Sequence, residues 1–352
     1  MTCVRSAPTC HYVELRRSDN MNVVDLPDGV AVRRAHVNGV ELDLLEAGPA
    51  DGPVVVLAHG FPEGAYSWRH QLAPLAAAGW HVLAPDQRGY GWSSKPTSVS
   101  DYGIEALAGD LLALVDEAAG PDTPAVFVGH DWGALVMWDL ARLHPERCRA
   151  LVGVSVPFVN WPAAPTDVFK SLYGDSFFYI LYFQEVGPAE TELGVDPRTT
   201  LRRILWSASG DANTSEMMVQ STPRSAAGTG FLDVMSEPPG ALPSWCTAAD
   251  LDVYTDSFRE SGFFGPVSWY RNLDANRELV KDIDPSCLTM PVWFIGGTRD
   301  PVIARDQSGV ERMRTQIPGF RESVLLEGVG HWTQQEQPVE FNQALLRFLA
   351  EL

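Results

Sequence analysis

Basic residues are scarce in this sequence: its 352 residues include 26 Lys and Arg against 45 Asp and Glu, and the formal net charge at pH 7 is −19. Nucleic acids and anionic membrane surfaces bind basic protein surfaces, so neither is an expected partner. Long apolar runs are also missing, because no stretch approaches the roughly 20 apolar residues of a membrane span. The acidity is best explained by solubility.

Cysteine is scarce as well. The five cysteines are scattered and form no C-x-x-C pair or Cys/His cluster: Cys3, Cys10, Cys148, Cys246 and Cys287. This pattern predicts free thiols in a reducing cytoplasm, and neither a disulfide framework nor a metal site. Residues 1–20 lack the apolar segment of a signal peptide, so residues 1–28 are interpreted as an N-terminal extension.

The first half of the chain alternates strand-like and helix-like segments. Residues 30–37 and 41–47 flank Asn38-Gly39, a dipeptide that favours a tight hairpin turn. Short apolar runs then predict buried parallel strands, separated by amphipathic helices. The predicted strands are 54–58, 80–84, 125–128 and 151–156, and the predicted helices are 68–78, 104–119 and 134–144. This alternation predicts a mostly parallel sheet with helices on both faces.

The alternation stops after Pro157. Residues 159–275 are rich in aromatic residues, Pro and Gly, with helical stretches and no strand alternation. The α/β pattern then returns with strands at 292–296 and 323–326 and helices at 307–317 and 338–352. We therefore predict an α/β core made of residues 29–158 and 276–352, with a mainly helical cap, 159–275, inserted after the sixth strand.

The segment Gly129-His130-Asp131-Trp132-Gly133 follows a predicted strand and precedes a predicted helix. This is the context of a nucleophile elbow, G-x-nucleophile-x-G, in which a side chain at either glycine would crowd the strand against the helix. Esterases have Ser at the centre, whereas this chain has Asp131. A carboxylate attacks a saturated carbon to form an ester, which water can hydrolyse.

Two further residues complete a candidate triad. In the α/β-hydrolase fold the chain order is nucleophile, acid, histidine. Asp300 follows the strand 292–296 and His331 follows the last strand, so both join Asp131 at the carboxyl ends of predicted strands, where open α/β sheets place their sites. His130 should point away from Asp131, and His59 is expected to bond the backbone.

Two further candidates lie near predicted strand ends. Ser155 is set aside as a nucleophile, because its segment ends in Pro rather than Gly and is predicted to lie within a strand. His59-Gly60-Phe61-Pro62 follows the strand 54–58, where this fold places an oxyanion-hole donor. The backbone N–H groups of Phe61 and Trp132 are the two expected donors.

These motifs resemble those of the soluble epoxide hydrolase family, from about Val30 to the C-terminus. The core motifs, which haloalkane dehalogenases share, are His59-Gly60-Phe61-Pro62-Glu63, Asp86-Gln87-Arg88-Gly89-Tyr90-Gly91, Gly129-His130-Asp131-Trp132-Gly133 and Gly330-His331-Trp332-Thr333-Gln334. The more specific matches are two cap segments, Phe178 to Glu185, and Gly262 to Pro266 followed by Trp269-Tyr270-Arg271-Asn272.

The resemblance implies an activity and further site residues. Tyr179 and Tyr270 match the two cap tyrosines that hold the epoxide oxygen, and a phenol can supply the proton that an opening epoxide needs. Phe183, Trp269 and Trp332 are expected to line an apolar substrate pocket together with Trp132. The implied substrates are a small apolar epoxide and water, and the implied product is a vicinal diol. No cofactor or metal is implied, and a homodimer is left open.

Two other functions are weighed. A haloalkane or haloacid dehalogenase would use the same aspartate, but its halide needs N–H donors and no proton, which leaves Tyr179 and Tyr270 unexplained. Fluoroacetate-type enzymes typically have Arg after the nucleophile, where this chain has Trp132. A non-catalytic binding protein of the same fold should have lost a triad member or the oxyanion turn, and this chain keeps candidates for all of them.

Overall fold

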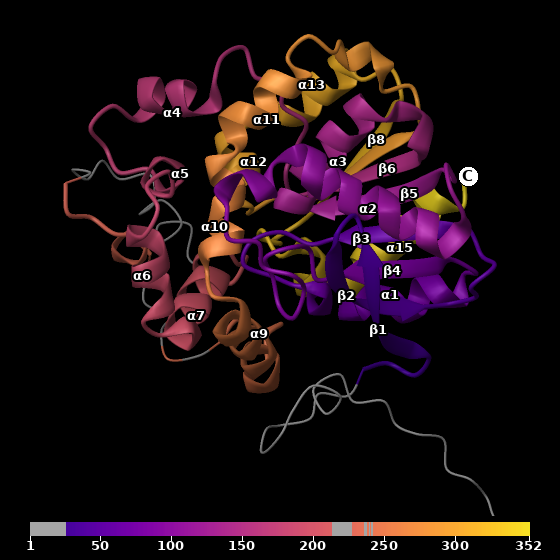
Figure 1. Ribbon diagram of the computed structural model, residues 1–352, viewed down its shortest axis with the longest axis horizontal. Coiled ribbons are helices and arrows are strands. Elements are labelled where there is room, and N and C mark those ends of the chain that lie inside the picture. Colours follow the sequence, from indigo (N-terminus) through magenta and orange to yellow (C-terminus); the bar gives the residue numbers. More distant parts are fainter. Residues whose placement is uncertain (1–25, 213–226, 236–237, 239, 241) are drawn as a thin grey trace, which may run out of the picture.

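The computed structural model describes residues 26–212, 227–235, 238, 240 and 242–352. Most of the predicted N-terminal extension, with Cys3 and Cys10, lies outside the described residues. An eight-stranded sheet forms the centre of the fold in the order β1-β2-β4-β3-β5-β6-β7-β8 (Figure 1). The strands are β1 (Val30–Val37), β2 (Val40–Ala47), β3 (Val54–Ala58), β4 (His81–Pro85), β5 (Ala125–His130), β6 (Cys148–Val154), β7 (Val292–Gly297) and β8 (Phe320–Leu326).

The sheet is mostly parallel, as predicted. β1 and β2 form an antiparallel hairpin whose turn residues, Asn38 (φ 47°) and Gly39 (φ 75°), both adopt the left-handed conformation that tight hairpins require. β2 also pairs antiparallel with β4, and the pairs from β4 through β8 are parallel. The carboxyl ends of β5, β7 and β8 therefore meet at one edge, where the three candidate triad residues follow them.

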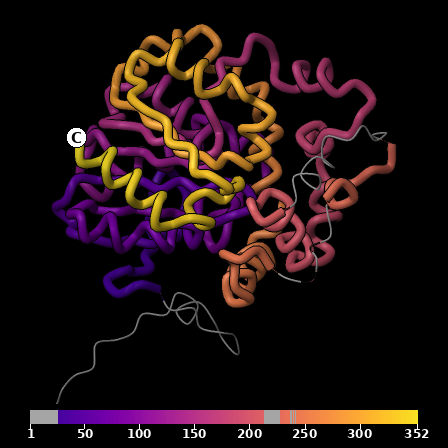
Figure 2. Tube along the Cα trace, turned by 180° about the vertical axis from the view of Figure 1, so that it is seen from behind, coloured from indigo at the N-terminus to yellow at the C-terminus, as the bar shows by residue number. Residues whose placement is uncertain are grey.

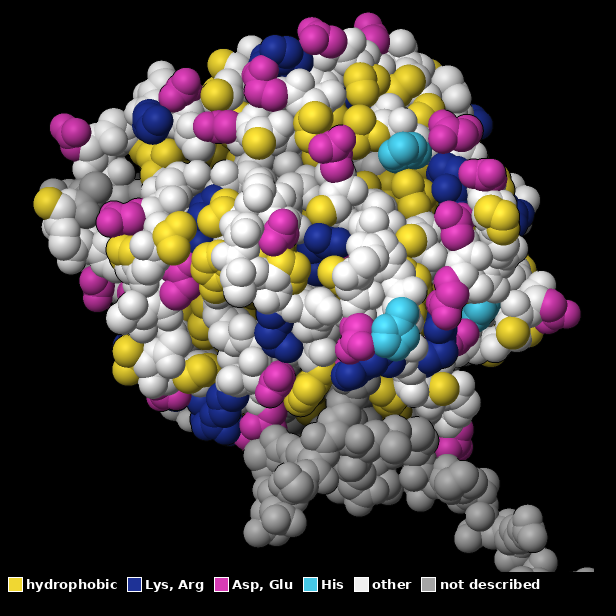
Figure 3. All heavy atoms as spheres, in the orientation of Figure 1, with side chains coloured by type: hydrophobic (Ala, Val, Ile, Leu, Met, Phe, Trp, Pro, Cys, Tyr) yellow, Lys and Arg dark blue, Asp and Glu magenta, His cyan; other side chains and the backbone are white. Residues whose placement is uncertain are grey.

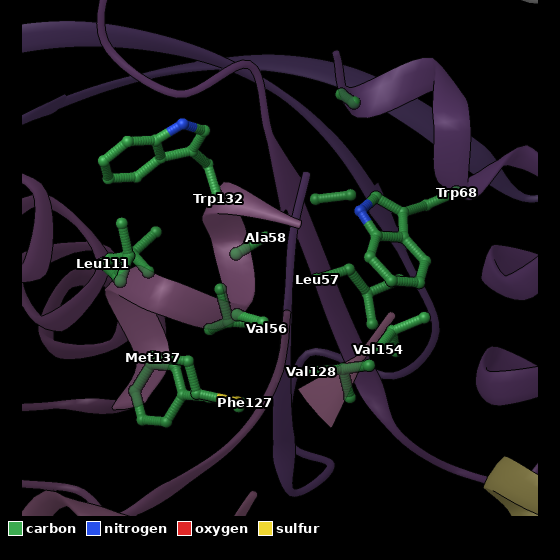
Figure 4. Packing of buried hydrophobic residues seen from close by; sticks show 14 of the residues in the cluster. Val56, Leu57, Ala58, Trp68, Leu111, Phe127, Val128, Trp132, Met137 and Val154 are labelled. Atoms are coloured by element: carbon green, nitrogen blue, oxygen red, sulfur yellow. The ribbon is translucent and has the colours of Figure 1, made fainter. Parts of the chain in front are cut away.

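Helices cover both faces of the sheet. α2 (Ile104–Ala119) and α3 (Trp132–Leu143) lie in front of it in Figure 1, and α15 (Pro338–Leu349) crosses the opposite face in Figure 2, where it packs with α1 (Arg69–Ala77). The central strands β3, β5 and β7 are buried along their whole length, because both of their sides are covered. Figure 4 shows Val56 and Leu57 of β3 on opposite sides of the strand, Leu57 on the same side as Trp68. The remaining core helices are α12 (Pro301–Arg305), α13 (Gly309–Gln316) and α14 (Thr333–Glu336).

The described segment between β6 and β7 is helical and stands largely beside the sheet (Figure 1). Its helices are α4 (Pro165–Tyr173), α5 (Tyr179–Tyr182), α6 (Pro188–Gly194), α7 (Pro197–Ser207), α9 (Ala248–Ser261), α10 (Phe264–Arg271) and α11 (Leu273–Val280). The cap boundaries 159 and 275 stay a prediction, and the second falls inside α11. On the face shown in Figure 3, acidic side chains are spread with basic ones interspersed.

One strand prediction was wrong at its end. β6 begins at Cys148 and ends at Val154, so Ser155 does not lie within a strand. The pairing of β6 with β7 ends at Val154, and the chain then turns toward the cap, with Ser155 in the left-handed conformation at φ 65°. Ser155 is buried, and its hydroxyl donates to the carbonyl oxygen of His331 at 2.8 Å. This serine therefore supports the loop that carries the histidine.

Candidate active site

Asp131 lies at the tip of the turn between β5 and α3. Its backbone adopts φ 52° and ψ −116°, a strained conformation for a residue other than glycine. A Cβ built on Gly129 would lie 2.3 Å from the carbonyl oxygen of Gly133, and one on Gly133 would lie 2.1 Å from that of Ala58. Only glycine fits at both flanks, which confirms the steric basis of the predicted elbow.

The carboxylate of Asp131 is held from two sides. Its Oδ1 accepts a hydrogen bond from the Phe61 N–H at 2.8 Å, and its Oδ2 lies 3.4 Å from Nε2 of His331. Burial raises the pKa of Asp131, but the hydrogen bond and positive charge of His331 outweigh burial and hold the pKa below its usual value. The carboxylate is therefore ionised at neutral pH, as a nucleophile must be.

His331 and Asp300 form the second part of the triad. Nδ1 of His331 lies 3.1 Å from each carboxylate oxygen of Asp300, which is fully buried and also caps α12 by accepting from the Val302 N–H. Burial lowers the pKa of His331, but the charges of Asp300 and Asp131 raise it well above its usual value. The structure thus places His331 between Asp131 and Asp300. This is the arrangement expected of a base that lies between a nucleophile and an acid.

These pKa shifts predict how stability depends on pH. The pKa of His331 is raised in the folded state, so its contribution is fully present below the unfolded value of about 6.5 and is lost as pH rises through the folded value. We expect the difference in Tm between the wild type and His331→Gln to be largest near pH 6 and to shrink steadily at alkaline pH. Thermal unfolding of both proteins across this range measures it, and a difference that does not change with pH would contradict the assignment.

One of the two expected oxyanion donors contacts the nucleophile directly. The Phe61 N–H already points at Asp131 Oδ1, the oxygen that would become the ester carbonyl. Trp132 is the first residue of α3, so its N–H belongs to the helical turn whose amides have no acceptor within the helix. A Cβ on Gly60 would lie 2.4 Å from Asp131 Oδ1, so the turn can approach the carboxylate only because residue 60 is glycine.

Both candidate tyrosines share a cavity with Asp131. The cavity has a volume of about 380 Å³, and its lining includes Asp131, Trp132, Tyr179 and Tyr270. The two phenol rings lie 5.9 Å apart at an angle of 77°. Burial raises the pKa of both phenols, and the negative charge of Asp131 raises them further. Both phenols are therefore protonated at neutral pH and can donate to a group bound between them and the carboxylate.

The other three predicted pocket residues are not part of this lining. The Phe183 ring packs 5.6 Å from that of Tyr179 and 5.1 Å from that of Tyr270, and Trp269 packs 5.8 Å from Trp132. The Trp332 indole donates to the carbonyl oxygen of Leu205 at 2.8 Å. Phe183 and Trp269 thus support the lining residues from behind, and direct substrate contact by all three stays a prediction.

The outer wall of the cavity was not predicted from the sequence. It is formed partly by α4, through Phe169, Leu172 and Tyr173, and by Arg305 at the end of α12. Leu172 is 72% exposed, so it marks the solvent end of the cavity. The three- and four-residue spacing of these apolar residues was the available signal, because it places them on one face of a helix.

A buried pair beneath the nucleophile was also missed. Glu63 Oε2 lies 2.6 Å from His130 Nδ1, and both side chains are fully buried. The other ring nitrogen of His130 lies 2.8 Å from the carbonyl oxygen of His331. His130 therefore points away from Asp131, as predicted. His59 bonds the backbone, as predicted, through the Gly60 carbonyl oxygen and the Gln87 N–H.

Among the described residues, no group of three or more His, Cys, Asp or Glu side chains is placed to hold a metal ion. Cys148, Cys246 and Cys287, the cysteines that the structure describes, form no disulfide.

Known proteins resemble this chain along most of its length. Residues 53–338 match the α/β-hydrolase fold family. The chain is 46% identical over 323 residues to epoxide hydrolase A of Mycobacterium tuberculosis, covering 91% of this chain and 97% of the relative. It is 34% identical to bifunctional epoxide hydrolase 2 of Rattus norvegicus, covering 88% of this chain and 54% of that longer protein.

Solved structures agree with these relatives. The crystal structure of epoxide hydrolase A from Mycobacterium thermoresistibile superimposes with a TM-score of 0.83 at 46% identity, covering 91% of this chain and 98% of that one. An epoxide hydrolase from an endophytic Streptomyces gives a TM-score of 0.84 at 38% identity, covering 92% and 96%. This chain therefore belongs to the epoxide hydrolases of the α/β-hydrolase fold.

Proposed function

We propose that this protein hydrolyses epoxides to vicinal diols through an ester formed on Asp131. One observation carries the proposal: the elbow carboxylate shares a cavity with two phenols, Tyr179 and Tyr270. A carboxylate nucleophile suits a saturated carbon, and the phenols suit an oxygen that becomes negative as the ring opens. The names of the relatives, which are epoxide hydrolases, support the same activity.

In the first step Asp131 attacks an epoxide carbon. Its Oδ2 is the attacking oxygen, because Oδ1 is engaged by the Phe61 N–H. A bond forms between Oδ2 and carbon, the ring C–O bond breaks, and the released oxygen takes a proton from Tyr179 or Tyr270. The product of this step is a hydroxyalkyl ester of Asp131.

In the second step water cleaves the ester. Esterification removes the charge of Asp131, which lowers the pKa of His331, so His331 gives its resting proton to the phenolate left by ring opening and neutral Nε2 becomes available as a base. His331, held by Asp300, takes a proton from water as the water oxygen bonds to the carboxyl carbon, and the N–H groups of Phe61 and Trp132 stabilise the oxyanion. The ester bond breaks, the diol oxygen takes the proton that His331 received from water, and the proton left on the restored carboxyl passes to Nε2 of His331, which returns to its resting protonated state.

A substrate panel tests the reaction class. We expect diol formation from an aryl epoxide to exceed halide release from a chloroalkane or fluoroacetate by at least about 10³-fold, because the two phenols supply a proton that a halide does not need. Initial rates measured on the same enzyme preparation give this ratio. Halide release at a rate comparable with epoxide opening would favour a dehalogenase instead.

A cytoplasmic location and a small apolar substrate are part of this proposal. The scattered cysteines support the first and the aromatic cavity supports the second. Among the described residues, no helix combines the length and apolarity needed to cross a membrane.

A further inference from the structure

The end of cap helix α7 is bonded to the loop that carries His331. The last carbonyl groups of a helix have no N–H donor within the helix, so they need donors from elsewhere. Here the Leu205 carbonyl oxygen accepts from the Trp332 indole at 2.8 Å, and the Ala208 carbonyl oxygen accepts from the His331 N–H at 2.8 Å. The histidine's own backbone amide is therefore held by the cap.

Glu336, the last residue of α14, bridges the same two segments. Its Oε2 accepts from the N–H groups of Gly210, at 2.8 Å, and Gly330, at 2.9 Å, and its Oε1 accepts from the Trp332 N–H at 3.1 Å. Gly330 and Trp332 are the residues on either side of His331, and Gly210 belongs to the turn that follows α7. One carboxylate thus satisfies three backbone donors, two from the core loop and one from the cap.

The two backbones also pack in direct contact. A Cβ on Gly330 would lie 2.3 Å from the Gly210 nitrogen and 2.5 Å from the Ala208 carbonyl oxygen, and a Cβ on Gly210 would lie 2.2 Å from the Gly328 carbonyl oxygen. Neither segment can shift toward the other. Loss of the bridging carboxylate would therefore let them separate and leave three backbone donors without an acceptor.

We propose that Glu336 is a positioning residue for His331: it fastens the turn after α7 to both neighbours of the histidine, so that the seating of the cap sets the alignment of the base. This inference rests on the proposed role of His331 as the base of ester hydrolysis. That alignment is narrow, because the imidazole must keep both its 3.1 Å contacts to Asp300 and its 3.4 Å approach to Asp131. Ester formation uses Asp131 and the two tyrosines and does not need the base.

Glu336→Gln separates these two steps. The amide keeps one acceptor oxygen, so it can accept from Gly210 and Gly330 only by turning its N–H donors toward the Trp332 N–H, and the bridge is weakened while the size is kept. We expect ester hydrolysis to slow by about 10-fold to 100-fold, as for a catalytic group misplaced by about 1 Å. Ester formation should stay within about threefold of the wild type, so the ester accumulates during turnover of an aryl epoxide and is seen by intact mass.

Glu340→Gln is the matched control, since it makes the same carboxyl-to-amide replacement on an exposed residue in the first turn of α15 and should leave both steps unchanged. Equal slowing of both steps by Glu336→Gln would assign Glu336 to cap stability alone and overturn the proposal, as would no change in either step. If Glu336→Gln does not fold, Glu336→Asp takes its place, with the same selective slowing expected. His331→Gln, measured in parallel, distinguishes failure of this inference from failure of the proposed function. If His331→Gln accumulates ester and the Glu336 variant does not, only the role of Glu336 is contradicted.

Discussion

His331→Gln is expected to stop the reaction after one ester has formed on each enzyme molecule. The glutamine side chain cannot accept a proton from water, whereas Asp131, Tyr179 and Tyr270 remain to open the epoxide. We expect turnover to fall by about 10⁴-fold or more, by analogy with the loss of a triad base. Intact-mass spectrometry should show the protein heavier by the mass of one substrate.

His144→Gln provides the control for this variant. His144 is exposed, with 46% of its side chain accessible, and it lies at the end of α3 away from the cavity lining. This variant should turn over at the wild-type rate and carry no adduct. Normal turnover by His331→Gln would show that another group activates water, and the assignment of the base would be wrong.

Replacing both tyrosines is expected to block the opposite half of the reaction. Phenylalanine at 179 and 270 keeps both rings but removes the hydroxyl groups that are proposed to give the opening epoxide its proton. We expect each single variant to slow ester formation by about 10-fold to 100-fold and the double variant by about 10²-fold to 10⁴-fold, the range for loss of general acid catalysis. Stopped-flow measurement of ester formation, with no ester accumulating during turnover, distinguishes this loss from that of His331.

Tyr182→Phe is the matched control for the tyrosine variants. Tyr182 lies in the same short helix as Tyr179, but its phenol is hydrogen-bonded to Glu192 and is not part of the cavity lining. Ester formation should stay unchanged in this variant. If the double variant also formed ester within about threefold of the wild-type rate, the proton would have to come from elsewhere.

Most of the core could be predicted because its signals are local. The helix predicted at 104–119 matches α2, and the hairpin around Asn38-Gly39 has the predicted turn. The elbow could be predicted because steric crowding restricts its flanks to glycine. The helix predicted at 307–317 corresponds to α13, whereas the short helix α12, which starts at Asp300 and Pro301, was not predicted. Asp followed by Pro is a signal for the start of a helix, so α12 could have been predicted from the sequence.

The residues of the cavity wall could not be predicted from local sequence signals. Phe183 and Trp269 are large aromatic residues of the kind expected in an apolar pocket. Tertiary packing nevertheless places them behind the residues that line the cavity, Tyr179, Tyr270 and Trp132. Glu63 and Glu336 look like ordinary charged residues in the sequence. Their partners lie 67 residues away at His130 and 126 residues away at Gly210, so only the folded arrangement brings each pair together.

A single turnover in ¹⁸O-labelled water, with enzyme in excess over an aryl epoxide, tests the covalent step most directly. If Asp131 supplies the oxygen that bonds to carbon, the first diol is unlabelled, and the peptide containing Asp131 becomes heavier by one ¹⁸O. Label found wholly in that first diol, with the peptide unchanged, would mean that water attacks the epoxide itself and that no ester forms.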